Sequence, residues 1–393
     1  MAADGAPLGA GGSAPGLEPG AGRGATSIEG RLASGVPTGD RPDADALAGA
    51  WDGPAGGGGV SPAAVHRFER RVMGSPLRLT LVCRPDDPPG LAERCWQAVS
   101  HEFDAADRAL SRHRPEAGLV ALNATAGSGR AVRVPERLYR AVALADRAWR
   151  VTGGAFDPRV AADLDRLGQP GVVPVRSPAA APPGDRPHRS WLVRRPRARR
   201  LVLAEPIDLG GIGKGLALRW AWRRLLTVFA RTRGSAGVGD PPRPPDALLE
   251  AGGDLVAAGS APEGGAWLVG IEDPSGGDAV LAVVLAQGAV CTSSIRLGRW
   301  RDRSNRLVHH LLDPRTGEPG GEGLVAVTVA WPDPAWAEVW TKTLFLAGRS
   351  GIAAEALRRR LAAWWVTADG ELAMTAAAAE RTVWPREGWR VVG

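Results

Sequence analysis

Apolar residues recur every three or four positions in five stretches of the chain, and this spacing is typical of amphipathic helices. The clearest case is 91–112, where Cys95, Trp96, Val99 and Phe103 share one face. A proline at 135 begins a second such stretch, and Gly153-Gly154 ends it. The pattern predicts helices over 91–112, 135–151, 217–229, 335–347 and 352–361.

Short apolar or alternating runs between these helices predict strands. The run 66–83 reads as one or two strands broken at Met73-Gly74-Ser75, and 191–193 with 201–203 reads as a hairpin. Residues 119–123 read as a short turn. The remaining predicted strands are 248–255, 267–271, 279–285, 290–293, 308–312, 324–331, 364–366 and 382–392. Their close spacing predicts a largely antiparallel sheet.

Three segments lack apolar periodicity and are rich in Gly, Ala or Pro. Residues 1–64 hold seven acidic residues against three arginines, and they cannot bury enough surface to order themselves. We read them as a disordered tail or an over-long start, with neither a secretory signal nor a cysteine for a lipid anchor. The ordered domain is expected over 65–393, with a Pro-rich insertion at about 169–190 and an internal linker at about 232–246.

Composition narrows the class of protein. The net charge of +7 comes from scattered arginines without a nucleic-acid motif, so no nucleic-acid partner is expected. No run of about eighteen apolar residues exists, and no transmembrane segment is expected. The three cysteines form no C-x-x-C and read as buried small hydrophobic residues. The expected compartment is the cytoplasm.

Lysine is almost absent from this chain. Of 49 Lys and Arg residues only Lys214 and Lys342 are lysines, which leaves 47 arginines. An ammonium and a guanidinium are not interchangeable, so a lysine kept in so arginine-rich a chain indicates a need for lysine itself. Chance retention is the alternative.

One lysine lies in a glycine-rich stretch. An apolar run ends at Asp208, glycines follow at 210, 211, 213 and 215 with Lys214 among them, and a helix begins. Glycines admit a ligand close to the backbone, and a helix N-terminus favours anions, so the stretch suits a phosphate or pyrophosphate. It is neither a P-loop nor a dinucleotide fingerprint, because Asp208 and Gly215 break the first pattern and the glycine spacing breaks the second. The alternative is a tight strand-to-helix turn with a solvated lysine.

The ordered set of short motifs resembles the ApbE family of FAD:protein FMN transferases over about 66–392. The motifs are Met73-Gly74-Ser75, Ser111-Arg112, Gly154-Ala155-Phe156-Asp157-Pro158, the stretch from Asp208 to Gly215, Gly252-Gly253-Asp254, Val269-Gly270-Ile271-Glu272-Asp273-Pro274, Thr292-Ser293-Ser294, the stretch from His309 to Gly317, and Ala337-Glu338.

This resemblance implies an α+β fold with a mixed or antiparallel sheet, flanking helices and two lobes around an FAD cleft. It also implies an activity in which Mg²⁺ helps to cleave FAD. FMN is attached to a threonine of an acceptor flavoprotein, and AMP is released. Two alternatives stay open, an FAD-binding protein without transferase activity and an FAD pyrophosphatase.

The resemblance also assigns site residues. His310 is expected to shuttle the threonine proton, and Lys214 to pair with the pyrophosphate. Without the family, two adjacent histidines in a strand read as one core and one surface residue. The implied FAD-binding set is Met73, Gly74, Ser75, Phe156, Asp157, Asp208, Gly210, Gly211, Lys214, Gly253, Asp254, Thr292 and Ser293.

The magnesium site departs from the family pattern. The family places an aspartate and, four residues later, a threonine on one helix, and this chain has Glu338 and Lys342 there. Glutamate can bind Mg²⁺, but an ammonium has no lone pair. The expected ligands are Gly213, through its carbonyl, Glu338 and Thr341. Lys342 could instead supply positive charge itself, or form an exposed i,i+4 pair with Glu338 of about 0.3–0.5 kcal/mol.

Overall fold

A computed structural model describes residues 63–175, 189–233, 243–276 and 279–393. Nearly all of the predicted tail at 1–64 lies outside the described residues. So do the middle of the predicted insertion at 169–190 and most of the predicted linker at 232–246.

The centre of the protein is a nine-stranded sheet in the order β1-β2-β6-β7-β10-β15-β16-β17-β19. Every neighbouring pair is antiparallel except β17 and β19, which run parallel, so the predicted sheet type is confirmed. The strands are β1 (Ala64–Val72), β2 (Ser75–Cys83), β6 (Asp246–Ala251), β7 (Asp254–Ala258), β10 (Gly288–Ser294), β15 (Leu324–Trp331), β16 (Ala362–Thr367), β17 (Leu372–Thr375) and β19 (Trp389–Val392).

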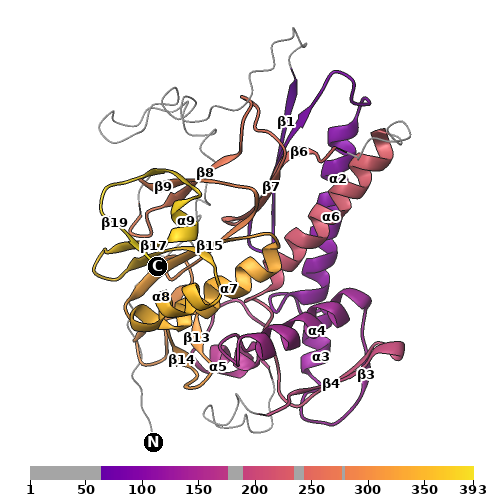
Figure 1. Ribbon diagram of the computed structural model, residues 1–393. Helices are drawn as coiled ribbons and strands as arrows, with labels where there is room; N and C mark the ends of the chain where they lie inside the picture. Colours follow the sequence, from indigo (N-terminus) through magenta and orange to yellow (C-terminus); the bar gives the residue numbers. More distant parts are fainter. Residues whose placement is uncertain (1–62, 176–188, 234–242, 277–278) are drawn as a thin grey trace, which may run out of the picture.

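Two long helices cover one face of this sheet. Helices α2 (Leu91–Leu110) and α6 (Gly213–Arg233) lie side by side against β1, β2 and β6 (Figure 1). Alternate strand residues such as Leu79 and Leu249 pack with Phe103 and Leu225 in the core beneath them. Their neighbours point to the opposite face, as the period of two requires.

A smaller sheet covers part of that opposite face. Its order is β18-β9-β8, from β18 (Thr382–Pro385), β9 (Val280–Leu285) and β8 (Leu268–Glu272). Val269 and Val284 of this sheet pack with Leu248, Val290 and Trp364 of the central sheet. The molecule therefore has helices on one side of the main sheet and a second sheet on the other.

A separate helical region lies below α2 and α6 in Figure 1. It contains α3 (Gly118–Asn123), α4 (Glu136–Val151) and a three-stranded sheet of β3 (Val132–Arg133), β5 (Arg200–Leu203) and β4 (Leu192–Arg195). Helix α7 (Pro334–Leu346) joins this region to the rest, because Val339 packs into its core while Leu344 packs against β15 and β16.

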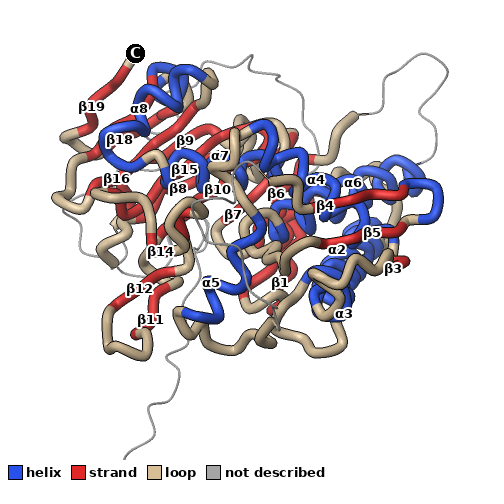
Figure 2. The backbone as a smooth tube through the Cα atoms, turned by 90° about the horizontal axis from the view of Figure 1, so that it is seen from below, coloured by secondary structure: helices blue, strands red, loops and turns tan. Residues whose placement is uncertain are grey.

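The remaining elements are short or peripheral (Figure 2). They are η2 (Pro158–Val160), α5 (Ala161–Arg166), η4 (Pro196–Ala198), β11 (Arg299–Arg301), β12 (Leu307–His309), β13 (Leu312–Asp313), β14 (Glu318–Pro319), α8 (Gly348–Arg358) and α9 (Ala376–Ala379).

Four predicted elements need correction. The strand expected at 248–255 is two strands, because Gly252 (φ 60°) and Gly253 (φ 90°) form a tight hairpin turn that suits positive φ. The strand expected at 308–312 is interrupted, because β12 ends at His309 and β13 begins at Leu312. The strand expected at 382–392 divides into β18 and β19, which belong to different sheets. The turn expected at 119–123 is the short helix α3.

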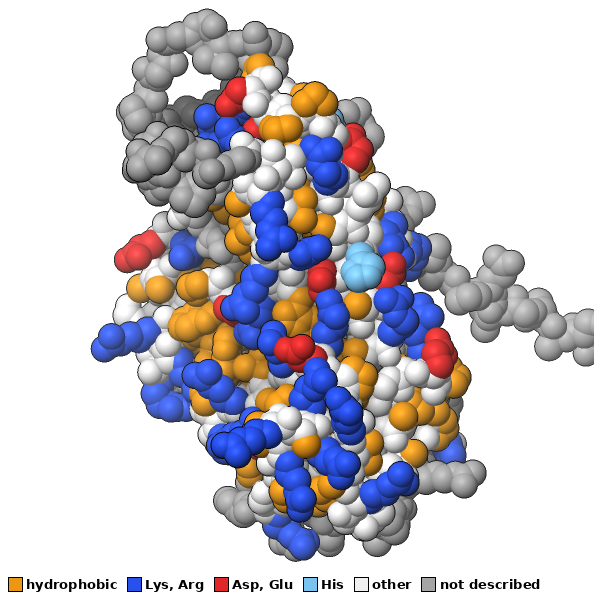
Figure 3. Space-filling model, turned by 90° about the vertical axis from the view of Figure 1, so that its right-hand side faces the viewer, with side chains coloured by type: hydrophobic (Ala, Val, Ile, Leu, Met, Phe, Trp, Pro, Cys, Tyr) orange, Lys and Arg blue, Asp and Glu red, His pale blue; other side chains and the backbone are white. Residues whose placement is uncertain are grey.

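The surface agrees with the scattered charge of the sequence. On the face shown in Figure 3, Lys and Arg side chains are interspersed with hydrophobic and acidic ones. Among the described residues, no helix combines the length and apolar character that crossing a bilayer requires.

Candidate functional site

The glycine-rich turn uses several of its own amides internally. Gly210 donates its N–H to Asp208 Oδ1 at 2.6 Å, and Gly213 donates to the Leu209 carbonyl at 2.7 Å. The N–H of Gly215 donates to Glu338 Oε2 at 2.8 Å. With these amides occupied, positive charge at the turn is left largely to side chains.

Helix α7 approaches this turn closely because Gly215 has no side chain. A Cβ at Gly215 would lie 2.5 Å from the Pro334 carbonyl oxygen, far inside contact distance. Gly211 is similarly close to α7, since a Cβ there would lie 3.3 Å from Lys342 Cδ and 2.9 Å from Phe156 Cε2. The glycines thus place Glu338 and Lys342 beside the turn, as the resemblance predicts.

Lys214 forms an ion pair with a buried carboxylate. Its Nζ lies 3.3 Å from Asp254 Oδ2, and Asp254 is 2% exposed. The other oxygen of Asp254 accepts the Thr292 N–H at 3.0 Å, which fixes the carboxylate. Asp254 raises the pKa of Lys214 above its ordinary value, so Lys214 is an ammonium at neutral pH.

The β6–β7 turn brings the first predicted FAD-binding motif to Lys214. A Cβ on Gly252 would lie 2.7 Å from Ser75 Cβ and 3.8 Å from Lys214 Nζ. Met73 has a positive φ of 49° in the β1–β2 turn, and its Cε would lie 4.0 Å from a Cβ at Gly213. The turn at Met73–Ser75 and the glycine-rich turn are therefore neighbours in space.

Lys342 also lies beside the glycine-rich turn, next to Gly211. Its Nζ lies 3.3 Å from Glu338 Oε1 and 3.3 Å from Ser293 Oγ, and Ser293 Oγ lies 2.7 Å from Thr341 Oγ1. Glu338 is 1% exposed, so the pair is not the exposed surface pair considered above. Burial raises the pKa of the Glu338 carboxyl, and the Lys342 ammonium opposes this. We call Lys214, Asp254, Glu338 and Lys342 the lysine cluster.

The expected magnesium ligands lie here, but their donors do not fit Mg²⁺. One oxygen of Glu338 accepts from Gly215 and the other faces the Lys342 ammonium. The Thr341 hydroxyl donates to the Glu338 carbonyl at 2.8 Å. Within the described ranges, no three His, Cys, Asp or Glu side chains converge to hold a metal ion. A hard cation needs several oxygen ligands, and here an ammonium holds the place beside the carboxylate.

His310 adjoins the lysine cluster. Its N–H and its Nδ1 both contact the Gly298 carbonyl, at 2.9 and 3.0 Å. A carbonyl only accepts, so Nδ1 carries the proton and Nε2 is left as an unprotonated acceptor. Burial lowers the pKa of His310 to about 4, and the charges of Lys342 and Lys214 act in the same direction.

The two adjacent histidines have different surroundings. The His309 ring packs edge-on against Phe345 with centroids 6.0 Å apart. His310 is held by Gly298, where a Cβ would collide with the imidazole at 1.8 Å from Nδ1. The His309 Nδ1 accepts the Leu311 N–H at 3.3 Å, whereas His310 is held by the Gly298 carbonyl and is close enough to Lys342 and Lys214 for their charges to act on it.

Three predicted FAD-binding residues have their side chains engaged elsewhere. Thr292 points to the sheet face opposite Ser293, with its hydroxyl 2.9 Å from that of Thr328. The Asp157 carboxylate binds Arg159 through Nε at 2.9 Å, and both side chains are fully buried. Asp208 Oδ2 accepts from Arg112 at 3.2 Å. These side chains position the site rather than face the lysine cluster.

Arg112 helps to build the site, although the sequence analysis gave it no role beyond its place in the Ser111-Arg112 motif. It is 3% exposed and binds both Asp208 and Asp165. The Asp208 N–H donates to the Pro158 carbonyl at 2.7 Å, which ties the glycine-rich turn to η2. The only sequence signal was the Ser111-Arg112 motif. We call the set Arg112, Asp157, Arg159, Asp165 and Asp208 the arginine buttress.

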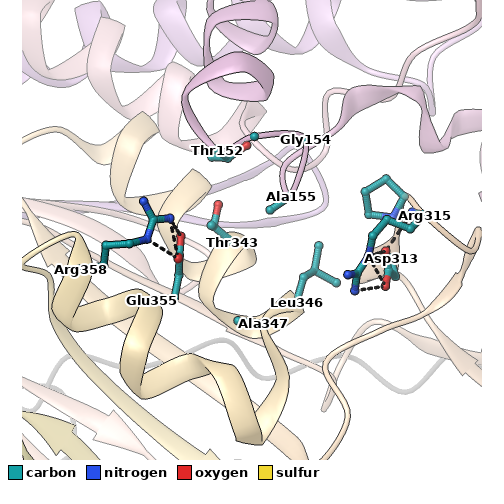
Figure 4. Close-up of a pocket in the computed structure, with 12 residues that line it drawn as sticks. Thr152, Gly154, Ala155, Asp313, Arg315, Thr343, Leu346, Ala347, Glu355 and Arg358 are labelled. Atoms are coloured by element: carbon teal, nitrogen blue, oxygen red, sulfur yellow. Dashed lines mark hydrogen bonds and ion pairs between the residues drawn. The ribbon is translucent and has the colours of Figure 1, made fainter. Parts of the chain in front are cut away.

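A cavity of about 310 Å³ lies beside these elements (Figure 4). It is bounded by the turn at Gly154, by Asp313 and Arg315, and by the facing ends of α7 and α8. Two ion pairs flank it, Arg315–Asp313 at 2.7 Å and Arg358–Glu355 at 2.6 Å. The residues of the lysine cluster do not line it, although Gly154 and Asp313 are two and three residues from Phe156 and His310.

Known proteins with similar sequence share most of this domain. A "FAD:protein FMN transferase" from Klebsiella pneumoniae (strain 342) is 27% identical over 323 residues, covering 79% of this chain and 87% of the relative. A "FAD:protein FMN transferase" from Treponema pallidum (strain Nichols) is 29% identical over 261 residues, covering 61% of this chain and 67% of the relative.

Solved structures agree with the fold. The apo flavinyl transferase ApbE of Pseudomonas stutzeri superposes with a TM-score of 0.65 at 26% identity, covering 81% of this chain and 97% of that one. The ApbE protein of Thermotoga maritima superposes with a TM-score of 0.67 at 23% identity, covering 82% of this chain and 100% of that one. The family model for the ApbE family matches residues 73–365. From the β1–β2 turn to β16, then, this chain belongs to the ApbE family.

Proposed function

We propose that this protein transfers FMN from FAD to a threonine hydroxyl of an acceptor flavoprotein and releases AMP. The observation that carries the proposal is that Lys214 and Lys342 lie at one glycine-rich turn, with an unprotonated His310 Nε2 close enough for both lysine charges to act on the ring. The relatives from Klebsiella pneumoniae and Treponema pallidum are FAD:protein FMN transferases, which supports the same reaction.

The chemistry follows from these groups. The threonine oxygen attacks the phosphorus on the FMN side of the pyrophosphate, forming a new P–O bond. The P–O bond to the AMP phosphate breaks, and AMP leaves with the bonding electrons. The threonine proton passes to His310 Nε2, which is unprotonated near neutral pH because the pKa of this histidine is lowered.

The lysines supply the charge that such a reaction needs. Phosphoryl transfer depends mainly on positioning and on neutralising the phosphate oxygens. Lys214 is 32% exposed and already an ammonium, so it can reach a pyrophosphate at the turn. The Met73–Ser75 turn and Phe156 adjoin the same turn and would contact other parts of FAD.

Magnesium belongs to the expected reaction, but no step here passes through it. The donors around Glu338 do not suit it, because an ammonium lies 3.3 Å from the carboxylate.

The test uses an acceptor domain that the Klebsiella pneumoniae relative modifies, with that relative as the positive control. The protein is incubated with FAD and the acceptor, and both products are followed. We expect the acceptor to gain the mass of FMN less one water, with an equal amount of AMP. An unmodified acceptor beside a modified control would refute the proposal.

The same assay separates the alternatives. AMP with free FMN in the absence of acceptor would indicate an FAD pyrophosphatase. Retained FAD without AMP under either condition would indicate a flavin-binding protein.

A further inference from the structure

We propose that the ammonium of Lys342 takes the place of the divalent cation at this site, so that the protein binds the FAD pyrophosphate with two lysines and without metal. This inference rests on the proposed function for its substrate, but it concerns how the site neutralises charge. It is carried by the position of Lys342 Nζ between Glu338 and Ser293.

Lys342 has a donor to spare. An ammonium has three N–H groups, and in the described part of the chain its partners are Glu338 Oε1 and Ser293 Oγ. The third is available to a phosphate oxygen. Gly211 packs against the methylene groups of Lys342 and has no side chain that would cover them. The Lys342 side chain is 14% exposed.

The surroundings hold the ammonium rather than a metal. The Ser293 hydroxyl bridges Lys342 and Thr341, so the hydroxyl expected to bind magnesium is linked to the lysine instead. Glu338 is fixed by the Gly215 N–H on its other oxygen. A divalent cation placed against Glu338 would meet a like charge at contact distance, which is strongly unfavourable.

The charge balance of the lysine cluster supports the same reading. Two ammonium groups face two buried carboxylates, Asp254 and Glu338, so the free site is neutral without a metal. An incoming pyrophosphate at the glycine-rich turn then meets two ammonium groups, Lys214 and Lys342. Arginine would not fit this role, because its planar fork is larger and more rigid than an ammonium.

The retained lysines of the sequence thereby gain a common explanation. Lys214 and Lys342 are the only lysines in 393 residues, and both lie at this one turn. Chance retention does not predict that they would meet.

The first experiment needs no variant. The affinity of the whole protein for FAD is measured by flavin fluorescence in EDTA and again with Mg²⁺ in excess, while binding of Mn²⁺ alone is followed by its paramagnetic resonance signal. We expect the two FAD affinities to agree within about twofold and Mn²⁺ to remain free. Stoichiometric Mn²⁺ binding, or FAD affinity that rises tenfold with Mg²⁺, would overturn the proposal.

The second experiment exchanges the cation. Lys342→Thr restores the oxygen donor of the family pattern, Lys342→Met removes the charge with little change of length, and Arg140→Met is the control at an exposed position. In EDTA both Lys342 variants should bind FAD at least tenfold more weakly, and Mg²⁺ should restore affinity to Lys342→Thr alone. Unchanged affinity in both would overturn the proposal.

These outcomes are separable from failure of the proposed function. Metal-independent FAD binding without any transfer to the acceptor leaves the inference in place and refutes the transferase. Transfer that stops in EDTA refutes the inference and leaves the transferase in place.

Discussion

The arginine buttress and the lysine cluster are built around the same turn but differ in their contacts. In the buttress, Arg159 holds Asp157 through two guanidinium nitrogens with both side chains at 0% exposure. In the lysine cluster, Lys214 and Lys342 each reach their carboxylates at 3.3 Å and stay 32% and 14% exposed. The Arg159–Asp157 pair is closed to solvent, whereas both lysines keep part of their side chains exposed.

The difference follows from the two cations. A guanidinium offers a rigid fork that matches a carboxylate and suits buried pairs. An ammonium is a compact charge on a flexible stem and can turn a donor towards a phosphate. Under the proposed function, arginine fixes the position of the turn and lysine binds the phosphate there.

Loss of His310 should have the largest effect, and only on chemistry. His310→Asn should slow transfer about 10²–10⁴-fold, because the base for the threonine proton is gone. FAD affinity should change less than about threefold, since no part of the proposed FAD contact is removed. Single-turnover assays with flavin titration measure both. A parallel fall in affinity would mean that His310 binds FAD instead.

Substitutions in the arginine buttress should mainly lower the free energy of unfolding. Asp157→Ala leaves the Arg159 guanidinium buried without its main partner, which costs about 3–5 kcal/mol of unfolding free energy. Chemical denaturation measures this. The matched control is Arg140→Ala, whose exposed pair with Glu136 is worth at most about 1 kcal/mol. Equal losses in the two variants would contradict the proposed role of the buttress.

Substitution of Lys214 should mainly weaken the binding of FAD. Lys214→Met should weaken FAD by about tenfold or more, because a charged hydrogen bond is worth about 1.5–3 kcal/mol. Its effect on unfolding should stay below that of Asp157→Ala, since Lys214 is one-third exposed. A variant that keeps its FAD affinity would remove Lys214 from the proposed site.

The pH dependence gives a smaller effect that reports on His310. The pKa of His310 is lowered from 6.5 to about 4 in the folded protein. Between these values the unfolded chain binds a proton that the folded protein does not, so stability falls as pH falls. One histidine accounts for at most about 1.4 kcal/mol per pH unit.

This effect is read as a difference between two proteins. The difference in unfolding free energy between wild type and His310→Asn should be constant above pH 6.5. As the pH falls from 6.5 towards 4, wild type should lose stability relative to the variant. A gap that is independent of pH would show an ordinary histidine pKa at this position.

Much of the fold was predictable because its signals are local. The break at Met73–Ser75 and the helices α2, α4, α6 and α7 follow from apolar spacing and from proline or glycine at their ends. The division of β6 from β7 was missed because a strand pattern continued through Gly252–Gly253. The break between β12 and β13 was missed because a strand-like pattern continued from Val308 to Leu312.

The glycine-rich stretch could be proposed as a phosphate site from its own residues, but its distant neighbours were predictable only through family resemblance. Periodicity places Glu338 and Lys342 on one helix, but not beside Gly215, which lies 123 residues earlier than Glu338. The buried Asp157–Arg159 pair was equally hidden, because a carboxylate after a Gly-rich turn looks the same whether it binds a ligand or an arginine. The scarcity of lysine was the signal that lay in the sequence itself.

The most direct test is transfer by the wild-type protein in EDTA. FAD and the acceptor domain modified by the Klebsiella pneumoniae relative are added, and flavinylated acceptor and AMP are measured over one turnover. The lysine cluster predicts flavinylated acceptor and AMP in equal amounts, at a rate within about twofold of that with Mg²⁺. Transfer that occurs with Mg²⁺ and is absent in EDTA would contradict the account.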